Sequence, residues 1–269
     1  MKKLTKGALC ALFVFFILGC ADSIKKDFKK ANQEHKNGHF RKAAQLYDRV
    51  ISRDNSHPLA VEAMKEAAKI SFLEIKDYSR AARYYKLIIQ FSPDESDRMQ
   101  AQSQLASLYF EGLQDYASAA IEYSKLASST TIESERAAHK LSVARSYYYL
   151  GNYFQTLSEI SEVLKLKLDK QTEFHALLLN GNVFVAQKKF LEAAKLFEAI
   201  INKFPDKALV ENVHLILSLA HEESGDYKKA LTVLEQIKTV YKPEEYLELR
   251  IKRIQERAKN QPGAKGFRK

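Results

Sequence analysis

The sequence has few of the residues that cross-link a small fold. It contains two cysteines and no tryptophan among 269 residues, with five prolines and nine glycines. A disulfide framework or a cysteine-based metal site needs several cysteines. Cys10 and Cys20 are the two present, and both lie at the very start of the chain. The sequence therefore excludes a disulfide-stabilised scaffold.

Long apolar runs are also scarce, and the one that is present lies near the N-terminus. Residues 8–18, ALCALFVFFIL, carry no charge, and Lys2, Lys3 and Lys6 precede them. A positive segment followed by an apolar run of this length is typical of a secretory signal peptide. A transmembrane helix needs about 20 apolar residues, so the run is short for one.

The end of this run, Ile17-Leu18-Gly19-Cys20, resembles the lipobox of bacterial lipoproteins. The resemblance implies cleavage before Cys20 and acylation of its thiol and new amino group. Residues 1–19 are then the signal peptide, and residues 20–22 are the lipidated N-terminus with a short linker. In Gram-negative lipoproteins, Asp directly after the cysteine often signals inner-membrane retention, but Ala21 stands here. The resemblance thus implies a lipid anchor on the periplasmic face of the outer membrane.

Acidic residues are fewer than basic ones, but much of the excess lies at the two ends. The formal net charge is +10, and removal of the leader's three lysines leaves +7 (10 − 3). Four of these charges lie in an acid-free tail, at Lys259, Lys265, Arg268 and Lys269. A nucleic-acid-binding protein concentrates Lys and Arg on one face. The mildly basic body shows no such stripe, and the secretory leader argues independently against a nucleic-acid partner.

A repeat of 37–38 residues runs through the rest of the chain. In each copy an aromatic residue is followed, at offsets of three, seven and ten, by small or apolar residues. These offsets lie on one face of an α-helix. The aromatics are Phe40, Tyr78, Tyr116, Tyr153, Phe190 and Tyr227, and the residues at offset three are Ala43, Ala81, Ala119, Thr156, Ala193 and Ala230. A recurring period of this size indicates a repeat array.

The half-repeat before each aromatic is predicted to be a second helix. Small residues lie nine positions before the aromatic in most copies, at Ala31, Ser107, Ala144, Gly181 and Ser218, whereas the second copy has Lys69. A small residue on one helix and alanine on the other allow two antiparallel helices to approach closely. The turns are marked by Gly38, Gly151 and Gly225, and the starts of new repeats by Pro93 and Pro205.

This pattern resembles the tetratricopeptide repeat (TPR) over residues 23–242. The resemblance implies an all-α fold, an α-solenoid of about six TPR-like helical hairpins. The segment 243–259 has Leu247, Ile251 and Ile254 on one face, which predicts a capping helix at the end of the array. Residues 260–269 lack apolar periodicity and are predicted to be a disordered basic tail.

Motifs of catalysis and cofactor binding are missing from the sequence, which contains no HExxH, GxGxxG, P-loop or nucleophile elbow. His35 and His39 have the spacing of metal ligands on a continuous helix, but Gly38 predicts a turn between them. His221 stands where neighbouring repeats have aromatic residues, which predicts a packing role. The sequence therefore predicts no enzyme activity, no cofactor, no bound metal and no small-molecule substrate.

Binding to another protein is the remaining role. In TPR arrays the first helices of successive repeats line a groove, and the resemblance carries its contact positions to Asn32, His35, Arg145, Tyr148, Tyr149 and Asn182. Tyr147 is expected in the core. Tyr148 and Tyr149 point elsewhere; they are either exposed for recognition or packed against the fifth repeat. Phe28 occupies a place where chaperone-binding TPRs need a basic residue, so recognition of a C-terminal carboxylate is not predicted.

The leader and the repeats together predict a membrane-anchored lipoprotein that acts as a scaffold in the cell envelope. The segment KFPDKALVENVHLILSLAHEESGDYKKAL, residues 203–231, most resembles envelope TPR proteins such as the BamD-type lipoproteins. That resemblance implies outer-membrane protein assembly, with a β-barrel assembly protein as partner. Two alternatives are a pilotin-like factor for a secretin or type IV pilus, and a cell-wall coordination protein. The rival from another class is an accessory subunit of an envelope enzyme.

Overall fold

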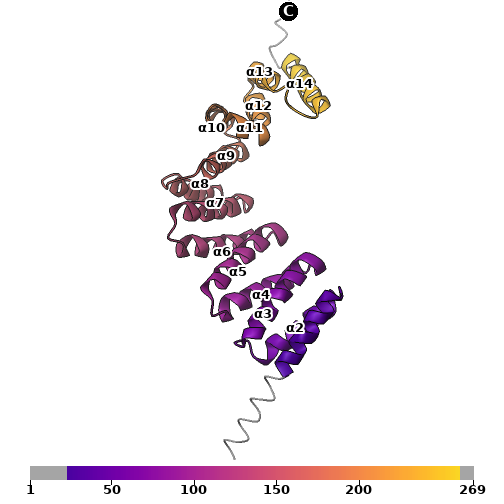
Figure 1. Cartoon of the computed structure of the whole chain (residues 1–269). Helices are drawn as coiled ribbons and strands as arrows, with labels where there is room; N and C mark the ends of the chain where they lie inside the picture. Colours follow the sequence, from indigo (N-terminus) through magenta and orange to yellow (C-terminus); the bar gives the residue numbers. More distant parts are fainter. Residues whose placement is uncertain (1–22, 261–269) are drawn as a thin grey trace, which may run out of the picture. The chain divides into compact units, whose positions relative to one another are not determined.

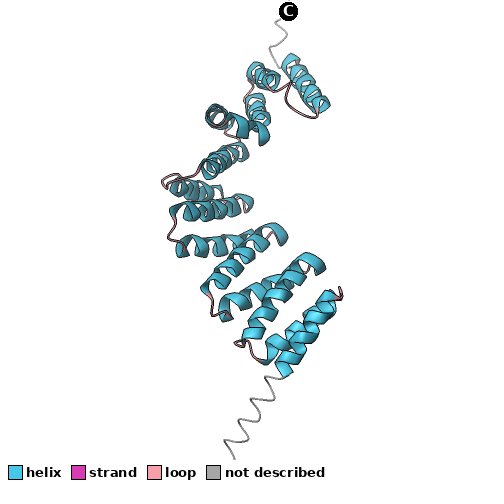
Figure 2. Ribbon diagram, viewed as in Figure 1, coloured by secondary structure: helices cyan, strands magenta, loops and turns pink. Residues whose placement is uncertain are grey.

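The computed structural model describes residues 23–260 of the chain. The predicted signal peptide, Cys20 and residues 261–269 of the predicted tail lie outside the described residues. All regular structure in the described part is helical (Figure 2), which confirms the predicted all-α array of hairpins. None of the described helices combines the length and the apolar composition that a membrane span requires.

The chain divides into two compact units, residues 1–126 and 127–269, and the described part of unit 1 contains three hairpins (Figure 1). Each hairpin packs a first helix against a second one. The first hairpin is formed by residues 23–36 and α2 (Phe40–Arg53). The next two are formed by α3 (Pro58–Ile70) with α4 (Tyr78–Phe91), and by α5 (Glu95–Ser107) with α6 (Tyr116–Ser129).

Unit 2 contains three further hairpins and one additional helix in its described part. The hairpins pair α7 (Glu133–Tyr149) with α8 (Tyr153–Val163), α9 (Lys170–Ala186) with α10 (Phe190–Lys203), and α11 (Pro205–Val210) and α12 (Val213–Glu223) with α13 (Tyr227–Gln236). The additional helix is α14 (Glu244–Lys259), which lies where the sequence predicted a capping helix.

The predicted repeat positions form the core of both units. All six residues at offset three from the aromatic have no exposed surface. The residues at offset ten are at most 3% exposed, namely Val50, Ile88, Leu126, Val163, Ile200 and Ile237. At offset seven Tyr85 and Tyr123 are partly buried, whereas the other four residues are fully buried. Burial of apolar surface contributes roughly 25 cal/mol per Å², so this face is the main source of hairpin stability.

The second and third repeats contain one extra residue, which their first helices absorb as a π turn. The segments η1 (Ser71–Ile75) and η2 (Leu108–Gly112) end these helices. The amide N–H before the aromatic bonds to a carbonyl six residues back, from Asp77 to Ser71 and from Asp115 to Tyr109. In the other four repeats the same N–H reaches only five residues back. A π turn of this kind is a single-residue insertion into a helix.

The insertion also changes which small residue packs inside the second and third hairpins. Ala68 and Ala106, ten residues before the aromatic, are 1% and 0% exposed. Ser107 is only partly buried, so its prediction as the packed small residue is wrong. Lys69, which broke the sequence pattern, lies on the exposed side because the pattern shifts by one residue.

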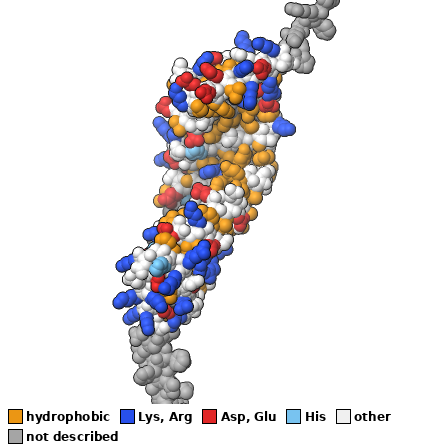
Figure 3. All heavy atoms as spheres, turned by 90° about the vertical axis from the view of Figure 1, so that its right-hand side faces the viewer, with side chains coloured by type: hydrophobic (Ala, Val, Ile, Leu, Met, Phe, Trp, Pro, Cys, Tyr) orange, Lys and Arg blue, Asp and Glu red, His pale blue; other side chains and the backbone are white. Residues whose placement is uncertain are grey.

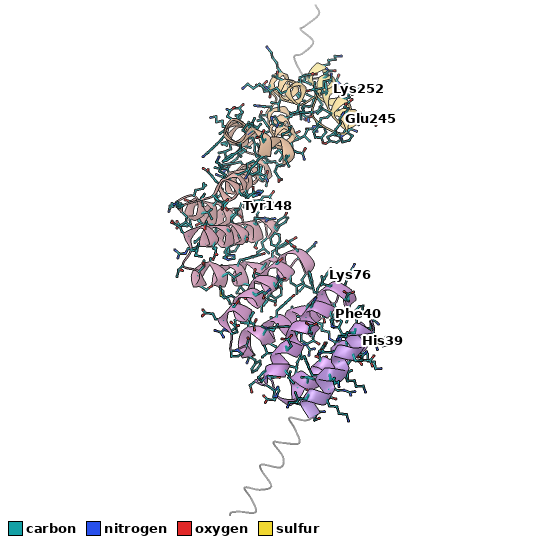
Figure 4. The ribbon with its side chains drawn as sticks, viewed as in Figure 1. His39, Phe40, Lys76, Tyr148, Glu245 and Lys252 are labelled. Atoms are coloured by element: carbon teal, nitrogen blue, oxygen red, sulfur yellow. The ribbon has the colours of Figure 1, made fainter. Side chains whose placement is uncertain are left out.

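The residue two places before each aromatic has a left-handed backbone in every repeat. The values of φ are +75°, +73° and +86° at the predicted turns Gly38, Gly151 and Gly225. Lys76, Gln114 and Lys188 hold the same place with φ of 56°, 52° and 58°. Figure 4 labels Lys76 at this turn, between η1 and α4. A left-handed φ costs a residue with a side chain about 1–2 kcal/mol, so three of the turns are strained.

Exchange of glycine and side-chain-bearing residues at these turns is expected to change stability in opposite directions. Gly151→Ala should lower the free energy of unfolding by about 1 kcal/mol, through backbone strain alone, because its added Cβ would meet no atom within 4 Å. Lys76→Gly should raise it by up to about 1 kcal/mol, since relief of strain exceeds the entropy cost of glycine. Urea unfolding of both variants tests this, and a neutral Gly151→Ala would contradict the account.

The first helix of the sixth repeat is interrupted, which the sequence pattern did not predict. α11 ends at Val210 and α12 begins at Val213. Asn212 between them has a φ of 57°, and its amide N–H bonds to Leu209 only three residues back. Asparagine adopts this conformation more readily than most residues. Because of this break Glu211 lies outside regular helix, and it lines the cleft described below.

Candidate functional site

A cleft of about 430 Å³ lies within unit 2, between the first helices of the fourth and fifth repeats, α7 and α9. Each helix contributes residues at spacings of three and four, which lie on one helical face. The lining residues are Ala138, Leu141, Ser142, Arg145, Tyr148 and Tyr149 from α7, Gln171, Thr172, His175, Leu178, Leu179 and Asn182 from α9, and Glu211.

Four of the six predicted groove residues come together in this cleft, namely Arg145, Tyr148, Tyr149 and Asn182. Arg145 and Asn182 are 37 residues apart, one repeat length, and therefore hold the same place on consecutive first helices. Leu141 and Leu178 are related in the same way. The repeat thus brings equivalent faces of α7 and α9 to one cleft, and contact of these residues with a partner remains a prediction.

The two tyrosines of the cleft differ in burial. Tyr149 is 54% exposed, whereas Tyr148 is half-buried and packs against a cluster that includes Leu141 and Ala144. The ring centroid of Tyr148 lies 5.6 Å from that of Tyr149, and burial raises the pKa of the Tyr148 phenol. Figure 4 labels Tyr148 on α7. In Figure 3, in which the right-hand side of Figure 1 faces the viewer, hydrophobic side chains gather over unit 2.

Tyr147 differs from its expected place in the core. It is only half-buried, and the residue with no exposed surface beside it is Ser146. The hydroxyl of Ser146 donates a hydrogen bond of 2.9 Å to the backbone carbonyl of Ser142, which satisfies it inside the helix. A small polar residue therefore takes the buried position, and the larger ring of Tyr147 is left at the edge.

His175 lies at the centre of the α9 face of the cleft and was not singled out by its sequence context. Burial lowers its pKa, an effect that Glu211 opposes and that Arg145 and Lys207 reinforce. Its Nε2 lies 2.6 Å from the side-chain amide nitrogen of Gln171. The cleft therefore offers an imidazole beside one arginine.

The hydroxyl groups of the cleft are engaged in local structure. Ser142 donates to the carbonyl oxygen of Ala138 at 3.1 Å, and Thr172 donates to the carboxylate of Asp169 at 2.8 Å. Neither hydroxyl donates to His175, so the cleft holds no activated nucleophile of the serine–histidine type. Across residues 23–260, no three histidine, cysteine or acidic side chains gather in a way that could hold a metal ion. What the cleft offers is surface for recognition.

The other two predicted groove residues, Asn32 and His35, belong to unit 1 and have partners there. The Tyr47 hydroxyl donates a 2.6 Å hydrogen bond to the Asn32 side-chain oxygen. Nδ1 of His35 lies 3.3 Å from the carboxylate of Glu66, and its ring lies 6.0 Å from that of Phe40. These contacts tie the first hairpin together and join it to α3, so both side chains have a structural role in unit 1.

Unit 1 also has two open depressions, beside the turns that join the helices of its hairpins. One, of about 590 Å³, is lined by residues that include His39, Phe40 and Glu74; the other, of about 580 Å³, includes Lys76 and Arg80. Figure 4 labels His39, Phe40 and Lys76 at these turns. Their linings come mainly from turn residues and charged side chains, and they lack the equivalent helix faces that build the cleft of unit 2.

The repeat geometry agrees with the comparison with known families. The family model for the tetratricopeptide repeat matches residues 28–96 and 178–240. This chain is a tetratricopeptide-repeat protein. Its α7 and α9 are first helices of consecutive TPRs, and the cleft lies on the helices that line the groove in this family. No curated protein sequence matches the chain significantly.

Several solved TPR structures have a similar fold. A tetratricopeptide repeat protein from Parabacteroides merdae is 16% identical, with a TM-score of 0.56, over 87% of this chain and 88% of the other. PilW, a type IV pilus biogenesis factor, is 12% identical with a TM-score of 0.55, over 85% and 98%. PilF of Pseudomonas aeruginosa is 14% identical with a TM-score of 0.50, over 89% and 99%. At these identities the likeness shows the TPR fold alone.

Proposed function

We propose that this protein is a lipid-anchored, non-enzymatic TPR scaffold of the bacterial cell envelope that binds a protein partner in the cleft between α7 and α9. The observation that carries the proposal is the meeting of Arg145, Tyr148, Tyr149 and Asn182 in one cleft of about 430 Å³. Arginine and tyrosine are the residues that most often carry binding energy in protein interfaces.

The chemistry of the cleft favours a mixed polar and apolar partner segment. Leu141, Leu178 and Leu179 offer apolar contact, while Asn182 offers an amide donor and acceptor. Arg145 and Glu211 lie in the same lining with opposite charge. A partner segment that presents both an acidic and a basic group beside an apolar side chain fits this arrangement, whether it arrives as an extended peptide, a helix or part of a folded domain.

The compartment is proposed from the leader. Lys2, Lys3 and Lys6, the apolar run and the lipobox-like ending at Cys20 support secretion, cleavage and lipidation, and Ala21 supports the outer membrane. Lipid chains hold a protein firmly only in combination, since each buried methylene contributes about 0.8 kcal/mol. On this proposal, Cys20 anchors the TPR array to the membrane and takes no part in catalysis.

Among the envelope roles, assembly of a type IV pilus or its secretin has the most support. PilW is described as a type IV pilus biogenesis factor, and this chain matches 98% of its length; it matches 99% of PilF. That agreement supports the pilotin-like role over the BamD-type role in outer-membrane protein assembly. We propose the type IV pilus as the pathway, and we expect a secretin or another pilus assembly protein as the partner.

Capture of the partner with matched variants tests this proposal. The lipidated protein is purified in mild detergent, and co-purifying proteins are identified by mass spectrometry. The cleft variant Arg145→Ala/Tyr149→Ala/Asn182→Ala is expected to lose at least tenfold of the bound partner, because truncated hot-spot residues cost 1–2 kcal/mol or more each. The control Asn202→Ala/Tyr246→Ala/Arg253→Ala removes the same residue types at exposed positions outside the cleft and should retain it.

Three outcomes would each contradict a part of the proposal. If the cleft variant and the control retained equal amounts of the partner, the cleft would not be the partner-binding site. The lipid anchor would be ruled out if the Cys20→Ala variant reached the same membrane fraction as the wild type and intact mass showed that residues 1–19 remain attached in the wild type. Enrichment of a β-barrel assembly protein in place of a secretin or pilus protein would return the BamD-type role.

A further inference from the structure

The exposed face of the first described helix consists almost entirely of lysine. In residues 23–36 the exposed side chains are those of Lys25, Lys26, Lys29, Lys30, Gln33 and Lys36. They lie between 100° and 240° around the helix when it is viewed along its axis, taking Ile24 as zero and 100° per residue. The five lysines, called here the lysine face, extend over about 16 Å along the helix. No acidic side chain lies among them.

The acidic residues of the first hairpin are committed elsewhere. Asp27 pairs with Arg53 at 2.8 Å, and Glu34, which lies at the edge of the lysine face, pairs with Lys42 at 2.8 Å. Asp48, the third acid of the hairpin, pairs with Arg80 and Arg83 of α4. No lysine of the lysine face forms an ion pair within residues 23–260. Ion pairs with other described residues therefore do not neutralise its positive charge.

A helix at the other end of the array shows that solvation alone does not require such a face. The exposed residues of α14 include four acids and four basic residues. Glu245 and Lys252, labelled in Figure 4, both belong to this exposed surface. The difference between the lysine face and the mixed surface of α14 is lost when charges are counted over the whole chain. The sequence alone therefore showed no basic stripe. In Figure 3, Lys and Arg side chains crowd the end where the described chain begins.

The apolar side of the helix is already used inside unit 1. Ile24 is 2% exposed and Ala31 has no exposed surface, and the ring of Phe28 lies 6.0 Å from that of Tyr47. The helix therefore cannot insert its apolar face into another phase without unfolding the hairpin. A ligand must be recognised by the lysine face alone, as a fixed array of ammonium groups.

The chemistry that fits is a flat surface dense in phosphate. Lysine binds phosphate as a point charge, without the bidentate geometry that arginine uses to read bases or carboxylates, and the lysine face contains no arginine. A sequence-reading nucleic-acid surface also needs stacking or base-edge contacts, and Gln33 is the one exposed residue of another type. The first described residue of the helix, Ser23, is three residues after Cys20 in the sequence, a distance of at most about 10 Å along the chain.

We propose that the lysine face binds the headgroups of anionic phospholipids and holds the first hairpin flat against the membrane surface. This contact goes beyond the proposed lipid anchor and does not require it. It adds orientation to attachment, because a lipid on Cys20 fixes a point whereas five lysines on one helix face fix a plane. Each lysine near an anionic bilayer contributes about a factor of five to partitioning.

Vesicle binding of the unlipidated chain tests this proposal. Residues 21–269 contain the whole described fold and carry no acyl group, so the result does not depend on Cys20. Sedimentation with vesicles of phosphatidylcholine containing about one third phosphatidylglycerol should retain this protein, and retention should fall as salt is added. The variant Lys25→Gln/Lys26→Gln/Lys29→Gln/Lys30→Gln should bind at least a hundredfold more weakly, with an unchanged circular dichroism spectrum.

A matched control separates the lysine face from net charge. The variant Lys167→Gln/Lys195→Gln/Lys228→Gln/Lys252→Gln removes the same charge from exposed positions of unit 2 and should bind within a few fold of the wild type. Equal weakening of both variants would overturn the proposal, as would equal binding to vesicles of phosphatidylcholine alone. Displacement from anionic vesicles by duplex DNA at a lower phosphate concentration than that of the lipid would assign the face to nucleic acid and overturn it as well.

Discussion

Gly181→Val is expected to lower the free energy of unfolding of this protein by about 3 kcal/mol. Gly181 is the small residue of the fifth repeat, on α9, and it faces Phe197 on α10. A Cβ added at Gly181 would lie 2.4 Å from Cε1 and 2.7 Å from Cζ of Phe197, whereas carbon atoms prefer about 3.5–4.0 Å. Phe197 has no exposed surface, so its ring cannot turn aside into solvent. Overpacking of such a core costs about 1–3 kcal/mol or more.

The direction of this effect is opposite to that of helix propensity. Glycine inside a helix is about 1 kcal/mol less favourable than alanine, so Gly181→Ala would stabilise an isolated α9. In the protein the contact with Phe197 outweighs that gain, and Gly181→Ala should lower stability by about 1 kcal/mol. Urea unfolding followed by far-UV circular dichroism measures both variants. A Gly181→Ala variant more stable than the wild type would show that the two helices separate at little cost.

A second substitution in Phe197 should restore part of the lost stability. The fourth repeat combines a larger first-helix residue with a smaller partner, Ala144 with Ile160, and both are buried in one cluster. Phe197→Leu alone is expected to cost about 1 kcal/mol through a cavity. Combined with Gly181→Ala it should cost less than the sum of the two, with a coupling of about 1 kcal/mol or more. Additive losses would mean that the two residues do not share one space.

The core and the turns of the repeats were predictable because they follow a fixed period. Ala43 and Val50, for example, hold places that recur in every copy, and both have no exposed surface. The π turns were not predictable in the same way. A repeat of 38 residues can place its extra residue in any loop, and only the hydrogen bond from Asp77 to Ser71 locates it inside a helix.

The candidate site was predictable only for residues that occupy an equivalent position in successive repeats. Arg145 and Asn182 could be transferred from the groove positions of TPRs, and the structure places both in one cleft. His175 has no residue type or spacing that separates it from a surface histidine, and its contact with Gln171 and its place in the cleft lining appear only in the structure. The lysine face depends on which residues of one helix are exposed, and a charge count over the chain averages this away.

Glu222→Ala is expected to lower the free energy of unfolding by about 3 kcal/mol and to release α14. Glu222 lies in the last turn of α12 and is only 4% exposed. Its carboxylate accepts hydrogen bonds from two arginines of α14, from Arg250 at 2.8 Å and from Arg257 at 2.5 Å. The acid and its partners lie 28 and 35 residues apart, and no repeat position relates them. A hydrogen bond to a charged group contributes about 1.5–3 kcal/mol, and the loss of two such bonds is discounted here because the Arg250 and Arg257 side chains are 24% and 46% exposed.

The neighbouring acid supplies the control. Glu223 also accepts from Arg257 at 2.8 Å, but its side chain is 36% exposed. An exposed ion pair contributes about 1 kcal/mol at most, so Glu223→Ala should change stability little. Urea unfolding compares the two variants. Equal small losses of stability would show that Glu222 is effectively solvated. Equal large losses would show that both acids stabilise α14, through their shared partner Arg257.

Release of α14 can be separated from unfolding of the whole unit by limited trypsin digestion. The apolar face of the helix, Leu247, Ile251 and Ile254, packs against α13, so α14 protects the end of the array from water. If Glu222 holds the helix in place, Glu222→Ala should expose Lys252 and Arg253 to cleavage while α7 to α13 stay folded. Terminal repeats open more easily than internal ones, since each contacts a neighbour on one side only. A variant cleaved throughout unit 2 at the same rate would instead show that the capping helix and the repeats unfold together, with Glu222 supporting the whole unit.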